Sequence, residues 1–300
     1  MRLDDEQESG NFEDRTGQSS GGGFRFPMGG GGGLPIGGRM GCGTLIIVII
    51  AALVFGINPM QILGGDPSGT TGSSPQSQTS NATGQSTLDP QIKSTMLKVL
   101  GSTERRWTDM FAKSGTQYRP PTLVFYSRSN QSGCGAAQSA MGPFYCPADE
   151  KIYLDTDFFG ELANRFGAGG DFAAAYVIAH EVGHHVQQLT GVADRVQKEQ
   201  QRASQVQGNR LQVAMELQAD CYAGVWARND TNLIESGDIE EGLRAAHQIG
   251  DDVLQKASQG VVVEAAFTHG SAEQRVRWFR KGLETGELKQ CDTFAGRGVL

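Results

Sequence analysis

Three of the five histidines in this 300-residue chain surround one glutamate in the stretch AHEVGHHVQQ, residues 179–188. His180 and His184 are four positions apart, so they would share one face of a helix. Two imidazoles placed in this way can bind one Zn²⁺ ion. Glu181 lies beside His180, where it could accept a proton from a metal-activated water molecule. The spacing therefore predicts a zinc site that hydrolyses its substrate, with Glu181 as the general base.

A catalytic zinc site needs a third protein ligand and keeps its fourth position open. The segment MELQAD, residues 215–220, contains Glu216 and Asp220, again four positions apart on a predicted helix. Glu216 would be the third ligand, and Asp220 would lie behind it and accept the N–H of a ligating histidine. In isolation these acids would indicate a solvated helix face, but their neighbours are mostly apolar, which favours a buried and partnered role.

The third histidine of the stretch, His185, directly follows His184 and would point away from the shared face. We expect it outside the metal shell, as a polar helix residue or as a donor behind the ligands. The longer pattern H-E-x-x-H-x-x-G-x-x-H, which supplies a third histidine ligand, is excluded because residues 187 and 190 are Gln and Thr.

His269 precedes a predicted helix start, where Ser271 and Gln274 would form a capping box. It could donate to the oxyanion of an attacked carbonyl as a catalytic residue, or it could simply serve the helix entry. Arg275 and Arg277 could bind a substrate carboxylate, with structural ion pairs as the alternative. His247 is a helix residue without an assigned role.

The elements that must position these residues form a small sheet followed by many helices. The segment KIYLD, residues 151–155, alternates as a strand does, and it could be the edge strand that receives a peptide substrate or an ordinary hairpin strand. Another strand is predicted at 122–127. Apolar spacing predicts helices at 91–113, 156–166, 172–190, 193–207, 209–229, 239–258 and 271–284. The predicted class is α+β, mostly helical and zincin-like.

The first third of the chain differs from the rest in composition. Residues 1–40 are polar and then rich in glycine, so we expect a disordered cytoplasmic tail. Residues 41–63 lack charge and are long enough to span a bilayer, which a secretory signal peptide or a core helix fits less well. A flexible linker at 64–89 would lead to the folded domain at 90–300. Arg25 and Arg39 precede the span, and basic residues usually flank the cytoplasmic end of a span. The N-terminus should therefore be cytoplasmic, and the domain should lie outside the cytoplasm, in the periplasm or beyond it.

The four cysteines of the expected external domain are consistent with this placement. An oxidising compartment would favour two disulfides, for which three connectivities are possible, and proximity in the sequence favours Cys134–Cys146 and Cys221–Cys291. Four reduced, buried thiols are the alternative. The net charge of −7, without a basic stripe, argues against a nucleic-acid partner.

The segments HEVGH and ELQAD together resemble the motifs of the gluzincin metallopeptidases. GPFYCPADEKIYLD, AHEVGHHVQ, ELQADCYAG and HGSAEQRVRWF more closely resemble the bacterial family described as "putative neutral zinc metallopeptidase", whose members are membrane-anchored. The resemblance implies zinc ligands at His180, His184 and Glu216, and a general base at Glu181.

The sequence thus favours a membrane-anchored zinc metallopeptidase that acts on a peptide or protein substrate. One alternative is a non-catalytic zinc-containing binding or regulatory module of the cell envelope, although a structural zinc site has no use for Glu181. Another is a zinc hydrolase of non-peptide amides.

Overall fold

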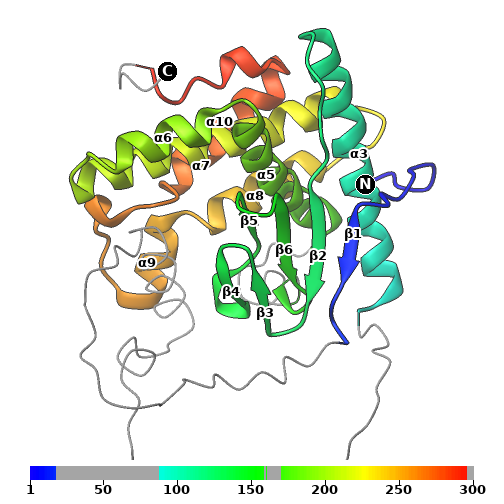
Figure 1. The fold of residues 1–300 in the computed structure, drawn as a ribbon, viewed down its shortest axis with the longest axis horizontal. Coiled ribbons are helices and arrows are strands. Elements are labelled where there is room, and N and C mark those ends of the chain that lie inside the picture. Colours follow the sequence, from blue (N-terminus) through cyan, green and yellow to red (C-terminus); the bar gives the residue numbers. More distant parts are fainter. Residues whose placement is uncertain (18–87, 159, 161–169, 296–300) are drawn as a thin grey trace, which may run out of the picture.

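The computed structural model of the chain describes residues 1–17, 88–158, 160 and 170–295, which form a mixed α+β body (Figure 1). The α+β class predicted from the sequence is confirmed. The helices of the described residues are α3 (Pro90–Lys113), α5 (Asp171–Leu189), α6 (Val192–Gln200), α7 (Gln205–Asn229), α8 (Asp238–Gln248), α9 (Asp251–Gln259) and α10 (Ala272–Thr285). The strands are β1 (Phe12–Asp14), β2 (Thr122–Tyr126), β3 (Ser129–Ser132), β4 (Gly135–Gln138), β5 (Phe144–Cys146) and β6 (Lys151–Asp155).

The main sheet has four strands in the order β1-β2-β6-β5, and β3 and β4 form a separate hairpin. Strands β1, β2 and β6 are parallel, whereas β5 runs antiparallel to β6. Of the two alternatives for residues 151–155, the edge strand is wrong, because β6 pairs on both sides, and the hairpin strand is confirmed by its antiparallel pairing with β5. The edge strand next to β6 is β5, which has only three residues. A strand this short gives no recognisable alternation of apolar and polar residues in the sequence.

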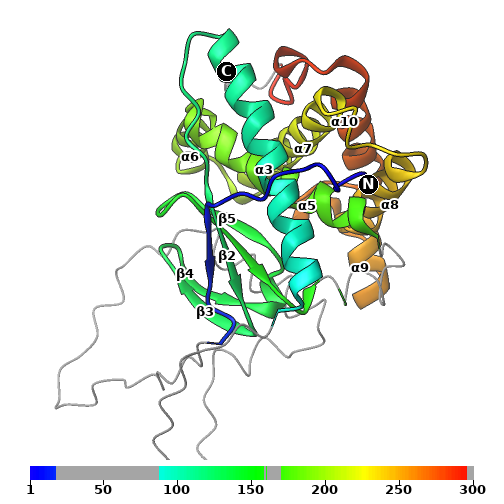
Figure 2. The ribbon, with the colours of Figure 1, turned by 90° about the vertical axis from the view of Figure 1, so that its right-hand side faces the viewer.

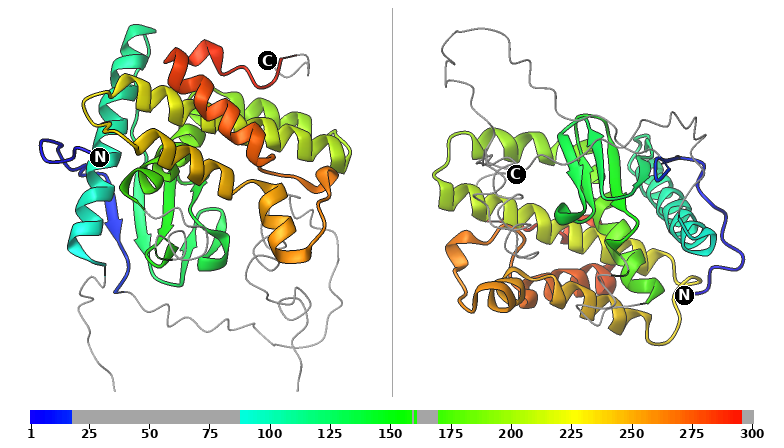
Figure 3. Two further views of the ribbon diagram at one scale, coloured as in Figure 1. Left: turned by 180° about the vertical axis from the view of Figure 1, so that it is seen from behind. Right: turned by 90° about the horizontal axis from the view of Figure 1, so that it is seen from below.

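The two faces of the sheet are covered differently. Leu123, Phe125, Ile152 and Leu154 point to one face and join a large core with α3, α5, α7 and α8. On the other face, Val124, Tyr126 and Tyr153 form a smaller cluster with Ala137 of the β3–β4 hairpin. Figure 2 shows α3 running in front of the sheet, and Figure 3 shows α5, α7, α8 and α10 gathered to one side of it.

Residues 1–17 are part of the folded body, so the prediction of disorder for residues 1–40 is wrong for this portion. Strand β1 pairs with β2, and the ring of Phe12 packs edge-on against Phe125 with centroids 6.5 Å apart. Composition gave no hint of this, because the segment is held by hydrogen bonds to the sheet, by ion pairs, and by three apolar side chains, Met1, Leu3 and Phe12, that pack against the core. Residues 18–87, with the predicted span at 41–63 and nearly all of the linker, lie outside the described residues. None of the described helices is long and apolar enough to cross a membrane.

The helix predicted at 239–258 is two helices, α8 and α9, which are separated around Gly250. Asp251 begins α9, and its carboxylate accepts hydrogen bonds from the backbone N–H groups of Thr268, His269 and Gly270. This long-range contact, which helical periodicity does not reveal, fixes the loop before α10. The capping box of Ser271 and Gln274 at the start of α10 is present as predicted.

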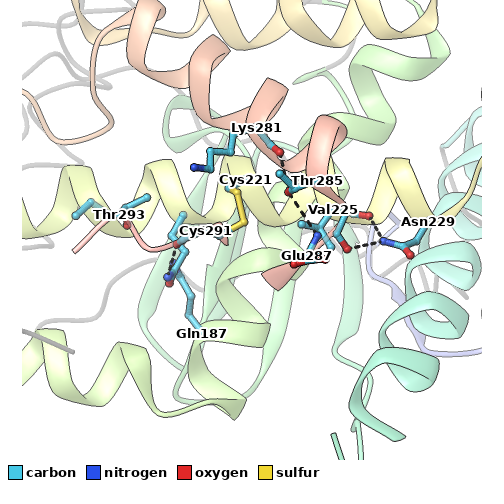
Figure 4. The surroundings of a disulfide bond; sticks show 12 residues. Gln187, Cys221, Val225, Asn229, Lys281, Thr285, Glu287, Cys291 and Thr293 are labelled. Carbon is cyan, nitrogen blue, oxygen red and sulfur yellow. Dashed lines mark hydrogen bonds between the residues drawn. A yellow bond between two sulfur atoms is a disulfide. The ribbon is translucent and has the colours of Figure 1, made fainter. Parts of the chain in front are cut away.

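The two expected cysteine pairings, Cys134–Cys146 and Cys221–Cys291, are at disulfide distance. Figure 4 shows that the second bridge ties α7 to the chain after α10. Next to this bridge, the carbonyl of Cys291 accepts from Gln218 Nε2 at 2.9 Å, and Thr293 Oγ1 donates to the carbonyl of Ala214 at 2.6 Å. The bridge therefore secures the C-terminal segment along α7.

Removal of the Cys221–Cys291 bridge by replacing both cysteines with alanine should lower the free energy of unfolding by about 4 kcal/mol, because the bridge closes a long loop in the unfolded chain. The sequence separation is 70 residues, against 12 for Cys134–Cys146. The matched double alanine variant of the short loop should lose about 3 kcal/mol. Urea unfolding without reductant measures both losses, and a larger loss for the short loop would contradict this prediction.

Candidate metal centre

Helices α5 and α7 pack closely where they carry the predicted ligands. A Cβ added to Gly183 would lie 3.0 Å from both the Cα and the carbonyl oxygen of Ala219 on α7. Such contacts are tighter than nine in ten real Cβ contacts, so a larger residue at position 183 would force α7 to shift by a few tenths of an ångström. The glycine inside HEVGH and the alanine inside ELQAD therefore permit the approach that brings the two motifs together.

The structure brings His180, His184 and Glu216 into one cluster. Their candidate ligand atoms lie within 4.8 Å of one another. Glu216 Oε2 is 3.1 Å from His180 Nε2 and 3.5 Å from His184 Nε2. His180 and Glu216 are each only 6% exposed. The three side chains are therefore close enough to bind one small cation together.

The Nδ1 atoms of both histidines are engaged by acceptors, which leaves each Nε2 free to act as a ligand. His180 Nδ1 lies 2.8 Å from Asp220 Oδ1, and His184 Nδ1 lies 2.9 Å from Gln187 Oε1. The amide nitrogen of Gln187 donates to the carbonyl of Met215, so the amide oxygen must face His184. Both rings therefore carry their proton on Nδ1 when they are neutral, and the two Nε2 lone pairs point toward Glu216.

The cluster favours positive charge. Burial alone would lower the pKa of His184. The Glu216 carboxylate and neighbouring acceptors have the larger, opposite effect and raise the pKa to about 9. For Glu216 the directions are reversed. Burial alone would raise its pKa, but His184 and the other histidines lower it well below its ordinary value. A site that stabilises protons on imidazole in this way would also stabilise a divalent cation, for which the protons would have to leave.

Glu181 lies beside the cluster on α5 and is 7% exposed. Burial raises the pKa of its carboxyl above the ordinary value, although His180 and His184 oppose the shift. The nearby backbone of Tyr145 in β5 also opposes the shift, because it favours the charged carboxylate. Its Oε2 atom is buried and finds no hydrogen-bond partner among the described residues. An orphaned carboxylate oxygen next to three possible ligands fits a zinc site at which Glu181 receives a proton.

Asp220 connects His180 to two further residues. In addition to His180 Nδ1, its Oδ1 atom accepts from the Tyr176 hydroxyl at 2.6 Å. Arg275 on α10 donates to both carboxylate oxygens at 2.9 Å. Burial raises the pKa of Asp220, but Arg275 and His180 lower it more, to about 2. The fully buried carboxylate is therefore ionised and fixes the orientation of His180.

Sequence reasoning missed Tyr176 and considered Arg275 chiefly as a structural residue, which its bidentate contact supports. The signal for Tyr176 was available, because it stands four residues before His180 on the same helix face. Arg277 and His247 are both exposed, and neither makes a hydrogen bond or ion pair with the cluster among the described residues.

His269 lies at the border of the cluster, in the loop that Asp251 fixes. Its Nδ1 atom is 3.3 Å from Asp251 Oδ1 and 3.1 Å from Thr268 Oγ1. Its side chain is 35% exposed, in contrast to the ligands. Burial lowers the pKa of His269, but the charges of Glu216 and Asp251 raise it above its ordinary value. The ring is thus held through Nδ1, near enough to Glu216 to sense its charge.

His185 is buried and links α5 to the sheet. Its Nε2 atom lies 2.6 Å from the carbonyl oxygen of Arg119, which can only accept. Nε2 must therefore carry the proton, and Nδ1, at 3.0 Å from the Tyr145 hydroxyl, accepts from it. Burial lowers the pKa of His185, in agreement with this neutral form. His185 thus lies outside the ligand cluster and anchors Tyr145 of β5 to α5.

Replacement of His185 by leucine should lower the free energy of unfolding by about 1–3 kcal/mol, because the Tyr145 hydroxyl and the Arg119 carbonyl would lose their partner. Urea unfolding measures this loss. His247→Leu is the matched control, since His247 is exposed on α8. Equal stability of the two variants would show that His185 has no anchoring role.

A second group of acids, Asp171, Asp238 and Glu241, is also close enough to share a cation. The ammonium group of Met1 lies 2.7 Å from Asp171 and 3.4 Å from Asp238. This group is therefore an ion-pair cluster at the start of α5.

Comparison with known proteins agrees with the site. Residues 1–294 match the family described as "Putative neutral zinc metallopeptidase". The chain belongs to this family. It is 45% identical over 301 residues to "Uncharacterized protein YpfJ" of Escherichia coli (strain K12), and the match covers 98% of this chain and 99% of that protein.

Two mycobacterial relatives match a smaller part of the chain. "Uncharacterized protein Mb2605" of Mycobacterium bovis is 44% identical over 191 residues, which is 59% of this chain and 64% of that protein. "Uncharacterized protein Rv2575" of Mycobacterium tuberculosis matches to the same extent. No solved structure matches the chain significantly.

Proposed function

We propose that this member of the family is a zinc-dependent peptidase whose metal ligands are His180, His184 and Glu216. The observation that carries the proposal is the buried, unpartnered oxygen of Glu181 beside two Nε2 atoms that converge on Glu216. A purely structural zinc site is closed by four protein ligands, whereas this cluster offers three.

When bound, zinc would supply Lewis-acid activation of a water molecule and of the substrate carbonyl. Glu181 would accept the proton of the attacking water and deliver it to the leaving amine. Its raised pKa suits both tasks better than an ordinary carboxyl group would. His269, held by Asp251 through Nδ1, could donate from its other nitrogen to the oxyanion that develops on the carbonyl.

The substrate would be an extended peptide. Strand β5 pairs with β6 on one side, and among the described residues no other strand pairs with it. It lies against α5 beside the site, since the Tyr145 hydroxyl of β5 is 3.0 Å from Nδ1 of His185, the residue after His184. An extended peptide can add to such an edge through main-chain hydrogen bonds, which would hold a scissile bond next to Glu181. On the opposite side of the sheet, β1 covers the edge of β2.

The full-length chain, purified in detergent, should contain about one zinc ion. It should hydrolyse an unfolded protein substrate, lose this activity to a zinc chelator and regain it when zinc is restored. Elemental analysis and a cleavage assay test the two parts separately. A chain without zinc would disprove the proposed site. Zinc without hydrolysis of any peptide library would instead favour a non-catalytic module.

A further inference from the structure

The N-terminal residues and the domain with the metal centre form one continuous sheet. The backbone N–H of Leu123 donates to the carbonyl of Asn11 at 2.9 Å, and that of Arg15 donates to the carbonyl of Phe125 at 2.8 Å. Between these two bonds, β1 is in parallel register with β2 from Phe12 to Asp14. These are main-chain hydrogen bonds, so the two segments must be in direct contact.

Ion pairs extend the contact from β1 to α3 on one side and to β6, the strand beyond β2, on the other. Lys93 at the start of α3 binds Asp14 at 2.8 Å, and Lys151 of β6 binds Glu13. Farther along α3, Arg105 pairs with Glu6. Charged residues of the N-terminal segment thus meet opposite charges on the domain in three separate places.

Helix α3 is also shaped to receive this segment. The backbone N–H of Ser9 donates to the carbonyl of Leu97 at 2.9 Å. A Cβ added to Gly101, one turn farther along, would lie only 2.4 Å from the carbonyl oxygen of Gln7. Gly101 therefore occupies a helix interior, where glycine is unfavourable by about 0.5–1 kcal/mol, at the point where the N-terminal backbone passes. The family match likewise begins at residue 1, so the segment is part of the sequence that the family shares.

The chain leaves and re-enters this body at one end. Figure 1 shows the C-terminal end of β1 and the first turn of α3 next to each other at the lower edge of the domain, and Figure 2 agrees. The ion pair of Asp14 with Lys93 joins these two points directly. In the sequence, the same two points flank the uncharged stretch at 41–63.

A single crossing of a bilayer would place residues 1–16 and the domain on opposite sides of about 30 Å of hydrocarbon. Strands cannot pair through such a layer. We propose that residues 1–16 and residues 88–295 lie on the same side of the membrane, so that the uncharged stretch does not carry the chain across a bilayer once. If the domain lies outside the cytoplasm, the N-terminus lies outside it too, and the cytoplasmic N-terminus expected from Arg25 and Arg39 is then wrong. This inference does not depend on the proposed function.

Thiol labelling of the full-length chain in bacterial cells tests the proposal. Cys42→Ser provides the background, and Asp5→Cys or Glu273→Cys adds one exposed thiol to the N-terminal segment or to α10. A membrane-impermeant maleimide should label both positions in intact spheroplasts, or both only after permeabilisation. Labelling of one position in intact spheroplasts and of the other only after permeabilisation would overturn the proposal.

A second measurement starts from the unsubstituted chain. A zero-length carbodiimide joins a carboxylate to an amine as an amide with loss of water. In membranes that hold the full-length chain, it should link Asp14 to Lys93 and Glu13 to Lys151, as mass spectrometry of the peptides would show. Lys93→Arg should remove the first link and leave the second. Absence of both links in the unsubstituted chain would also overturn the proposal.

Discussion

Replacement of Glu181 by glutamine is expected to leave zinc bound and to lower kcat for peptide hydrolysis by about 10²–10⁴-fold, the usual contribution of a general base. Glutamine has the shape of glutamate but cannot accept a proton at neutral pH. The ligands His180, His184 and Glu216 are untouched, so the metal content should not change. The measurement is elemental analysis of the purified variant, together with kcat and KM on a peptide substrate.

The structure suggests why the loss should fall on kcat. Glu181 Oε2 has no partner among the described residues, so the substitution disrupts no hydrogen bond of that atom in the folded protein. Burial raises the pKa of Glu181, so loss of its charge should not reduce stability either. Glu199→Gln is the matched control, because Glu199 is exposed on α6. An unchanged kcat for Glu181→Gln, with zinc present, would refute its role as base.

The clustering of His180, His184 and Glu216 could be predicted because it depends mainly on short-range helix geometry. The four-residue spacing in HEVGH and in ELQAD fixes which side chains share a face, whatever the rest of the fold does. The structure then needed only one close helix contact, between Gly183 and Ala219, to bring Glu216 to both histidines. The predicted partnership of Asp220 with a ligating histidine is present in the geometry.

The parts that the sequence did not reveal depend on contacts between distant residues. Strand β1 has three residues and pairs with a strand more than 100 positions away, so neither periodicity nor composition identifies it. Strand β5 is equally short, and for that reason the sequence left open whether β6 is an edge strand or a hairpin strand. Arg275 reaches Asp220 from a third helix, and no spacing rule connects α10 with α7.

Such contacts also changed the interpretation of the N-terminal third. Mean composition over residues 1–40 correctly registers that little apolar surface is available. Composition does not reveal that the edge strand β2 offers main-chain hydrogen bonds to a segment that lies beside it. A short polar segment can therefore be ordered by a partner surface that lies far away in the sequence.

Replacement of Asp220 by asparagine should weaken zinc binding about 10–100-fold, as is typical when the acceptor behind a histidine ligand is lost. The same change should lower the free energy of unfolding by about 3–5 kcal/mol, because Arg275 would remain buried without its counter-charge. Arg275 is only 3% exposed, and both carboxylate oxygens of Asp220 accept from it. A competition assay with a zinc chelator and urea unfolding of the metal-free protein measure the two effects.

The two roles of Asp220 can be separated by a second substitution. In the double variant Asp220→Asn with Arg275→Met, no buried charge is left unpaired, so most of the stability should return. Zinc affinity should stay low, because asparagine still cannot provide the charge that orients and polarises His180. Asp194→Asn, at an exposed position of α6, is the control for loss of one negative charge. Recovery of zinc affinity together with stability would mean that Asp220 acts on the metal only by keeping α7 and α10 folded together.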